Sequence, residues 1–222
     1  MSVARTLSLA GLMVAAGMAT ARDPVLAPPS QALPPSVQAM RDDLQRIVAA
    51  RDVQALRAHV RDATTLSFGG DTGPQGFDAL WLRDADATRE LWRILEEVLA
   101  LPGVARQEDG EAVYCAPYVY CLPYPGDLDV FEAQVWVGRD VAVRAKPDLA
   151  APVVTRVSHA VLTRVDDVVD GAGDSAWTRV RLASGQEGYI ATRLLRSPID
   201  YRISLVREGA RGWAFQYFVA GD

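Results

Sequence analysis

Two stretches in the amino-terminal half place apolar residues at three- and four-residue intervals, a spacing typical of amphipathic helices. The first begins at Ser36, which is expected to cap it, and polar side chains occupy its other face. The second covers 86–101, with Asp86 as its cap and Pro102-Gly103 as its end. The apolar faces predict that the two helices pack on one another. These faces contain Val37, Met40, Leu44, Ile47 and Val48 in the first helix, and Leu91, Trp92, Leu95, Val98 and Leu99 in the second.

Short alternating segments dominate the carboxyl-terminal half and predict β-strands. Four of them follow one another within 134–198, and two more, 201–206 and 213–219, are expected to form a hairpin. This hairpin is expected to pair with the region 111–133, so that the intervening strands are inserted into the helical unit. The four segments are 141–147, 153–157, 177–180 and 188–190.

The order of these four segments resembles that of a bacterial SH3-like domain, over about residues 134–197. In that family a Val-Arg pair with a nearby proline opens the domain, an apolar strand follows, and Trp-x-x-Val and Gly-aromatic-aliphatic strands close it. The sequence departs from the family at Ala142, where Asn is common, and at 158–160, which lacks the usual glycine. The matching residues are Val143, Arg144, Pro147, 153–157, Trp177, Val180, Gly188, Tyr189 and Ile190.

The resemblance implies a small β-barrel of a type that binds cell-wall peptide or polysaccharide in many exported bacterial proteins. Such a barrel presents a shallow groove in which aromatic faces and strand edges hold an extended peptide. Trp177 and Tyr189 are the candidate groove residues. Their alternation with Val180 and Ile190 suits core-facing side chains just as well, so both placements stay open.

The amino end, 1–21, has the pattern of a signal peptide. Its basic start at Arg5, its apolar run over 7–18 and the small residues Ala19 and Ala21 predict cleavage after Ala21. The apolar run is too short to span a bilayer, and no later stretch reaches the roughly 20 apolar residues that a spanning helix needs. We therefore expect an exported chain, periplasmic or secreted, without a transmembrane segment.

Charge limits the class of partner. Cleavage of the signal peptide would leave 22 basic and 28 acidic residues, a net charge near −6. Nucleic acid and anionic lipid both favour proteins with clustered Lys and Arg, so neither is an expected partner.

The domain organisation follows from these segments. The Pro-rich segment 22–35 is expected to be a semi-extended linker rather than packed structure. The fold class expected is α+β, with a helical unit, a small barrel and a hairpin. The predicted order is signal peptide 1–21, linker 22–35, mainly helical domain 36–133, SH3-like barrel 134–198 and hairpin 199–222.

Cys115 and Cys121 are the two cysteines, and an oxidising compartment favours their pairing. On a straight strand they would lie roughly 20 Å apart, far beyond the 7 Å or so that a disulfide tolerates. A bridge therefore requires a turn, which Pro117 can supply, and two buried thiols remain the alternative. Tyr118 and Tyr120 are candidates for a surface that binds a sugar or a partner peptide, or for a cover over the helices. The tyrosines of this region are Tyr114, Tyr118, Tyr120 and Tyr124.

No catalytic or metal-binding motif is recognisable. Neither cysteine opens a helix in a peptidase motif, and His59 and His159, about a hundred residues apart, supply no zinc cluster. The segment 66–77 is expected to be a loop, and its Gly-rich part, 69–74, lacks the Lys and Ser/Thr of a phosphate-binding loop. No enzyme activity, cofactor or metal is therefore expected.

Two functions follow from these patterns. The first is an exported binding or scaffold protein of the cell envelope, whose SH3-like module recognises peptidoglycan or an envelope protein. The alternative is a cell-wall-active hydrolase with an unrecognised active site in the amino-terminal unit, around the carboxylates of 127–132. A third hypothesis is a structural domain that only stabilises an assembly. Whether the mature chain is monomeric in solution would distinguish it from the other two.

Overall fold

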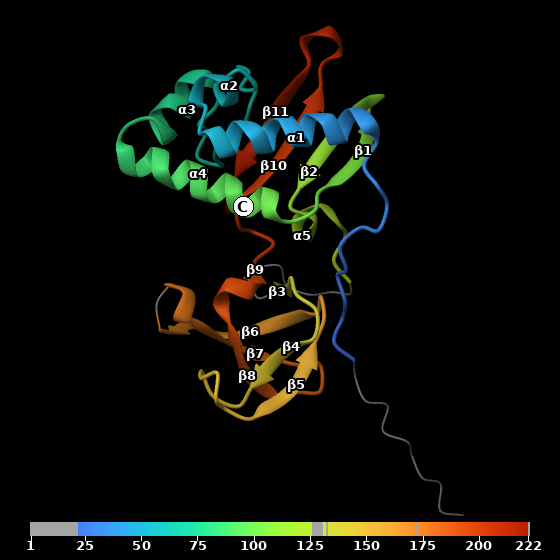
Figure 1. Cartoon of the computed structure of the whole chain (residues 1–222), viewed down its shortest axis with the longest axis vertical. Helices are drawn as coiled ribbons and strands as arrows, with labels where there is room; N and C mark the ends of the chain where they lie inside the picture. Colours follow the sequence, from blue (N-terminus) through green and yellow to red (C-terminus); the bar gives the residue numbers. More distant parts are fainter. Residues whose placement is uncertain (1–21, 126–130, 132, 172, 222) are drawn as a thin grey trace, which may run out of the picture.

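The computed structural model describes residues 22–125, 131, 133–171 and 173–221, so the expected signal peptide lies outside the described residues. The chain is α+β, as predicted, and forms two units stacked along its long axis (Figure 1). We call residues 35–121 and 202–219 the layered unit, and residues 133–196 the inserted unit. No helix in the described part of the chain has the length and apolar content needed to cross a membrane.

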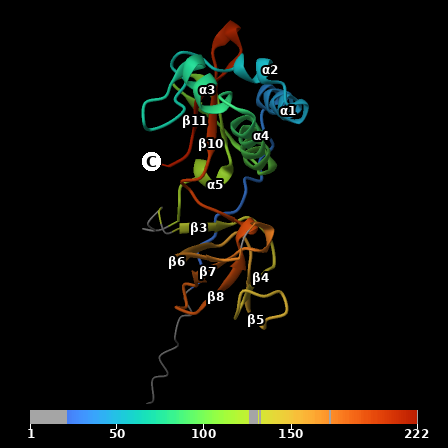
Figure 2. The same cartoon turned by 90° about the vertical axis from the view of Figure 1, so that its left-hand side faces the viewer.

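Helices cover one face of a four-stranded antiparallel sheet in the layered unit (Figures 1 and 2). Their facing side chains form one core, in which Leu44, Leu91, Tyr114 and Phe218 are at most 1% exposed. The region predicted to be mainly helical thus contains strands as well. The helices are α1 (Pro35–Ala50), α2 (Val53–Arg57), α3 (Gly73–Trp81), α4 (Ala85–Ala100) and α5 (Tyr118–Cys121), and the sheet has the order β1 (Val104–Glu108), β2 (Glu111–Ala116), β10 (Arg202–Arg207), β11 (Trp213–Val219).

Helices α1 and α4 carry the two predicted apolar faces, but both begin at other residues than expected. The Asp84 carboxylate accepts a hydrogen bond of 2.7 Å from the backbone N–H of Ala87, so Asp84 is the cap and Asp86 lies in the first turn. Helix α1 starts at Pro35, and no side chain caps it. Proline suits this position because the first backbone N–H groups of a helix have no partner within it. Ser36 is therefore an ordinary first-turn residue.

The expected Gly-rich loop is shorter than predicted, because α3 starts within it at Gly73. Pro74 then occupies the first turn, where its missing N–H costs no hydrogen bond. The segment is thus a helix start rather than a candidate phosphate loop.

Strand β2 joins two parts of the chain that are far apart in sequence. On one side it pairs with β1 across the tight turn at Asp109-Gly110, and on the other it pairs with β10, where Tyr114 lies opposite Leu205. Strand β10 pairs in turn with β11. The hairpin after the inserted unit is therefore part of the layered unit's sheet, and the chain leaves the layered unit after β2 and returns to it at β10.

The inserted unit is a single antiparallel sheet of seven strands. No ladder between described residues joins its outer strands, so the closed barrel that we predicted is not formed. Its apolar side contains Val143, Val180 and Ile190, all 0% exposed. In sheet order the strands are β5 (Val153–Val157), β4 (Val141–Arg144), β8 (Glu187–Ala191), β7 (Trp177–Arg181), β6 (Val161–Asp170), β3 (Ala133–Trp136) and β9 (Leu195–Arg196), and the short 3-10 helices of the chain are Gly173–Ser175, Thr192–Leu194 and Gly209–Arg211.

The Pro-rich segment 22–35 is extended, as predicted, but it is not an unpacked linker. The backbone N–H of Leu26 donates to the carbonyl of His159 at 2.8 Å, and that of Val161 donates to the carbonyl of Pro24 at 2.7 Å. The Leu26 side chain is 5% exposed. The segment packs because unpaired backbone groups next to β6 offer it hydrogen bonds, and because Leu26 and Leu33 pack against apolar clusters.

An apolar cluster joins the two units. Tyr118 and Val119 of α5 are each 1% exposed and pack with Leu26, Val135 and Val161. The layered unit contributes α5, the inserted unit contributes β3 and β6, and the amino-terminal segment covers the contact. Helix α5 therefore provides the buried contact of the layered unit with the inserted unit.

Candidate functional site

Tyr189 stands on the outward face of the inserted unit between two arginines. Strand β8 alternates, with Gly188 and Ile190 buried and Tyr189 partly exposed. The strand register places Tyr189 opposite Arg144 on β4 and opposite Arg179 on β7. Directly opposed residues have Cβ atoms about 5 Å apart. The phenol ring therefore has a guanidinium-bearing side chain on each side.

An apolar residue extends this line across the sheet. Val153 on β5 lies opposite Arg144 and is 43% exposed. We call Val153, Arg144, Tyr189 and Arg179, which occupy successive strands, the Tyr189 row. Leu149, in the adjoining turn, is 72% exposed. Apolar, cationic and aromatic side chains thus adjoin on one face of four strands.

Arg144 also holds the turn next to the Tyr189 row. Its Nη1 donates a hydrogen bond of 2.7 Å to the carbonyl of Ala151. The N–H of Ala145 donates to the carbonyl of Pro152 at 3.0 Å across the base of the same turn. The exposed Leu149 is therefore presented from a turn with internal hydrogen bonds.

One carboxylate balances part of the positive charge. Glu187 pairs with Arg181 at 2.9 Å and with Arg179 at 2.7 Å. The hydrogen bond from Arg181, followed by the charges of both arginines, holds the pKa of the Glu187 carboxyl below its usual range. Glu187 is therefore ionised at neutral pH. Two guanidinium groups thus share this single carboxylate.

Trp177 is one of the buried apolar residues, so it does not line an open groove. It is 8% exposed and hence does not offer a ring to a ligand. It alternates with Thr178 and Val180 along β7, so it lies on the sheet face opposite the apolar core. Of the two candidate groove residues, the structure places Tyr189 alone at the surface.

The comparisons with known proteins give one match. Residues 137–197 match the family model of the bacterial SH3 domain. The inserted unit is thus SH3-like. This is the segment in which the sequence resemblance was found, and it includes every residue of the Tyr189 row. No curated protein and no solved structure matches the chain.

Gly188 shows why the SH3-like pattern places glycine before the aromatic residue here. A Cβ at Gly188 would lie 2.5 Å from a methyl carbon of Val143 and 3.0 Å from the carbonyl oxygen of Arg144. Strands β8 and β4 could then not approach each other as they do. The glycine therefore permits the contact that sets Tyr189 beside Arg144.

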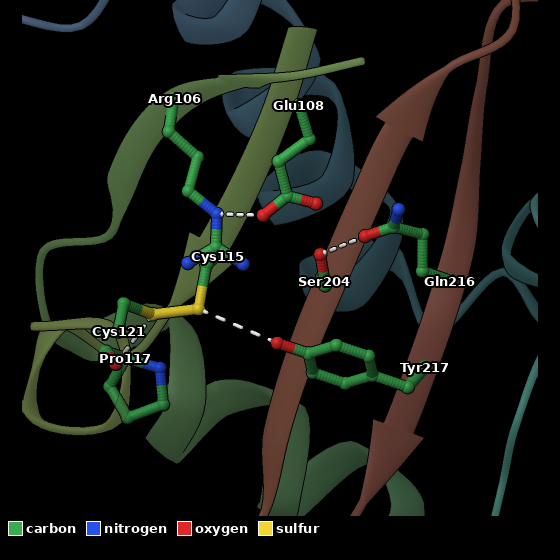
Figure 3. Close-up of a disulfide and its surroundings, with 8 residues drawn as sticks. All are labelled: Arg106, Glu108, Cys115, Pro117, Cys121, Ser204, Gln216 and Tyr217. Atoms are coloured by element: carbon green, nitrogen blue, oxygen red, sulfur yellow. Dashed lines mark hydrogen bonds and ion pairs between the residues drawn. A yellow bond between two sulfur atoms is a disulfide. The ribbon is translucent and has the colours of Figure 1, made fainter. Parts of the chain in front are cut away.

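The two cysteines form a disulfide, which was the favoured alternative in the sequence (Figure 3). Their Cα atoms are 5.8 Å apart, because the chain reverses at Pro117 between the end of β2 and α5. Cys115 Sγ lies 3.7 Å from the hydroxyl of Tyr217 on β11 (Figure 3). The disulfide thus ties α5, on which the inserted unit rests, to the central sheet of the layered unit.

The tyrosines near the disulfide do not form a common surface. Tyr114 and Tyr118 are buried, and burial raises the pKa of both phenols. Tyr120 is 37% exposed, and its ring lies edge-on to Tyr217 with centroids 6.2 Å apart. Burial is also the main cause that raises the pKa of Tyr217, to about 12. Tyr118 therefore covers the unit contact, and Tyr120 is the candidate that reaches solvent.

Arg202 contacts the rings of both Tyr120 and Phe68, and neither Arg202 nor Phe68 was singled out by sequence reasoning. The guanidinium of Arg202 lies 4.4 Å from the ring centre of Tyr120 and 5.5 Å from that of Phe68. Arg202 is 4% exposed and donates to the carbonyls of Asp200 and Gly221 at 3.3 and 2.7 Å. Its contacts fix the end of the chain, so we assign it a structural role.

The residues that the sequence offered for catalysis are not brought together into one site within the described part of the chain. Both cysteines are in the disulfide and supply no thiolate. His59 Nδ1 lies 2.8 Å from the carbonyl of Trp213, and His159 lies in the other unit. In the part of the chain that the structure describes, no three His, Cys, Asp or Glu side chains are placed to hold a metal. Asp127, Asp129 and Glu132, considered for a hydrolase, lie outside the described residues.

Proposed function

We propose that this protein is an exported, non-enzymatic binding or scaffold protein of the cell envelope, and that its SH3-like unit recognises peptidoglycan or an envelope protein. The observation that carries the proposal is the Tyr189 row, a partly exposed aromatic and cationic line on a segment that matches the bacterial SH3 domain. The signal-like amino end and the disulfide support export, because disulfides persist in oxidising compartments.

The chemistry of the row favours a peptide that carries free carboxylates, such as the peptide part of peptidoglycan. Arg144 and Arg179 offer planar donors that match a carboxylate, and the ring of Tyr189 between them offers an apolar face. Val153 and Leu149 extend this apolar surface. Recognition would therefore combine ion pairing with contact between ring and aliphatic groups.

The first test is sedimentation of residues 22–222 with purified peptidoglycan. We expect the protein to sediment with the wall material and Tyr189→Ala to remain in the supernatant. Phe68→Ala is the matched control, because it removes an exposed ring from the layered unit. If the wild type and Tyr189→Ala sediment equally, the Tyr189 row is not the binding site. If the wild type does not sediment, peptidoglycan is excluded and an envelope protein is the remaining partner.

Point variants are required because neither unit is a continuous piece of chain. A fragment that ends before the inserted unit lacks β10 and β11, which supply half of the layered unit's sheet. Loss of binding in such a fragment would report unfolding as readily as loss of the site.

A further inference from the structure

A pocket of about 290 Å³ lies where the two units meet. Its walls come from α4, from the Pro117 turn with α5, and from the segment 196–201 that leads back into the layered unit. Ligand-binding pockets occur preferentially at the contacts between structural units, and a volume near 300 Å³ suits a small molecule rather than a macromolecule.

The floor of the pocket is apolar. Ile94 and Val98 from α4 and Val119 from α5 are at most 4% exposed, and all three line the pocket. They lie on two elements that the disulfide and the helix core hold in place. The floor is therefore a fixed surface suited to an aliphatic group.

The rim carries charges of both signs. Arg93 and Glu97 of α4 pair with each other at 2.5 Å. Arg196 donates to the carbonyls of Arg193 and Leu195, at 3.1 and 2.7 Å, and has no carboxylate within ion-pair distance among the described residues. Arg196 can therefore accept an external carboxylate as its ionic partner.

Asp200 supplies an accessible negative charge on the same rim. One of its carboxylate oxygens accepts a hydrogen bond of 2.8 Å from the backbone N–H of Ser197. Desolvation raises the pKa of the Asp200 carboxyl although the residue stays on the surface; the hydrogen bond from Ser197 and the charges of Arg196 and Arg164 oppose this rise, and Glu97 adds to it. Glu97, Arg196 and Asp200 all line the pocket, so a ligand bound in it can meet both carboxylates and the guanidinium.

We propose that this pocket binds a small zwitterion with an aliphatic side chain, either a free α-amino acid or a dipeptide. Its ammonium group lies against Asp200 and Glu97, and its carboxylate pairs with Arg196. Its aliphatic side chain rests on Ile94 and Val98. The site is separate from the Tyr189 row, so this inference does not depend on the proposed wall binding.

The test is calorimetric titration of residues 22–222 with four probes: leucine, alanyl-leucine, N-acetyl-leucine and leucine amide. We expect at least one of the two free zwitterions to bind with a Kd of about 1 mM or lower, and each blocked leucine to bind at least about tenfold more weakly than leucine, because one charge contact is lost. Absence of binding by leucine and alanyl-leucine at about 10 mM, ten times that Kd, would overturn the proposal. So would blocked probes that bind as well as leucine.

Two variants test which residues hold the two ends. Arg196→Gln should weaken leucine binding about tenfold and remove the preference for leucine over leucine amide. Asp200→Asn should weaken it similarly and reduce the preference over N-acetyl-leucine, while its amide oxygen can still accept from the Ser197 N–H. A fold defect would not change one preference and spare the other. If both variants keep both preferences, the assignment of the pocket is wrong.

Matched controls remove the same charges nearby. Arg193→Gln removes an arginine from the same segment, and Glu96→Gln removes a glutamate next to Glu97; neither residue lines the pocket. Both should bind leucine like the wild type. Arg196→Gln should still sediment with peptidoglycan if the wild type does, which distinguishes failure of this inference from failure of the proposed function.

Discussion

Gly103 lies directly against the ring of Tyr114: a Cβ at Gly103 would come within 2.4 Å of two ring carbons. The ring cannot move aside easily, because it is 0% exposed and its hydroxyl accepts a hydrogen bond of 3.2 Å from Arg41 Nε. We therefore expect Gly103→Ala to lower the free energy of unfolding by about 1–3 kcal/mol, the usual range for an overpacked core. Urea denaturation followed by tryptophan fluorescence measures the change.

Gly69→Ala is the control for this substitution. Its Cβ would meet nothing closer than Ser67 Oγ at 3.4 Å, an ordinary contact. It should leave the urea midpoint nearly unchanged. If Gly103→Ala were equally neutral, the helix-to-strand connection before β1 would be far more adjustable than its packing indicates.

Removal of the disulfide should destabilise the protein by about 2 kcal/mol, because the unfolded chain gains conformational entropy when the loop between the two cysteines is no longer closed. The loop is small, with a sequence separation of 6, so the effect lies at the low end. The double variant Cys115→Ala/Cys121→Ala avoids a buried hydroxyl and tests this by urea denaturation. Adding reductant should lower the midpoint of the wild type and not that of the variant; equal midpoints for the variant and the oxidised wild type would contradict the expectation.

Stability should fall on mild acidification because of His159. Burial, and then the charge of Arg139, lower the pKa of this imidazole from 6.5. The unfolded chain therefore takes up the proton at a higher pH than the folded protein. The free energy of unfolding falls as the pH drops below 6.5, the pKa of the unfolded imidazole. Urea midpoints at about pH 7.5 and pH 5.5 bracket this window, which lies above the usual titration range of Asp and Glu carboxyls.

His159→Asn is the matched variant, since the residue has a positive φ of 50°, a conformation that Asn tolerates. It should show a smaller loss of stability between the two pH values than the wild type. An equal loss in both proteins would mean that another group is responsible.

Binding through the Tyr189 row should combine a salt-sensitive and a salt-resistant part. Arg179→Gln is expected to reduce sedimentation with peptidoglycan mainly at low salt, where exposed charges act at longer range. Tyr189→Ala should reduce it at low and high salt by at least about fivefold, or ~1 kcal/mol. Arg156→Gln, an exposed arginine on β5 outside the row, is the control. A salt profile that Arg179→Gln leaves unchanged would argue against ion pairing.

The local parts of this fold were largely predictable from the sequence. The apolar faces of α1 and α4 could be read from their spacing, because helix periodicity is a local property. Two signals were missed: Pro74 in the first turn of α3, and the Asp109-Gly110 pair that connects β1 to β2. The choice of Asp84 over Asp86 as a cap depends on which backbone N–H groups face each carboxylate, and spacing alone does not decide it.

The site depended on strand register, which a single sequence does not supply. Arg144 and Arg179 are on different strands from Tyr189, and each is its neighbour only because of the pairing that the structure shows. The contact between Phe68 and Arg202 likewise joins residues that are far apart in the sequence. For Trp177, the sequence predicted the strand correctly. It did not show which face of β7 packs against the core, so the direction of the Trp177 side chain stayed open.

The insertion of one unit between β2 and β10 sets the order in which the protein can fold as it is made. The SH3-like segment is fully synthesised before β10 and β11, so its own sheet can form while the layered unit still lacks half of its strands. The apolar faces of α1 and α4, although synthesised first, receive their covering strands last. A newly made chain therefore carries an incompletely covered helical face until its final residues are synthesised.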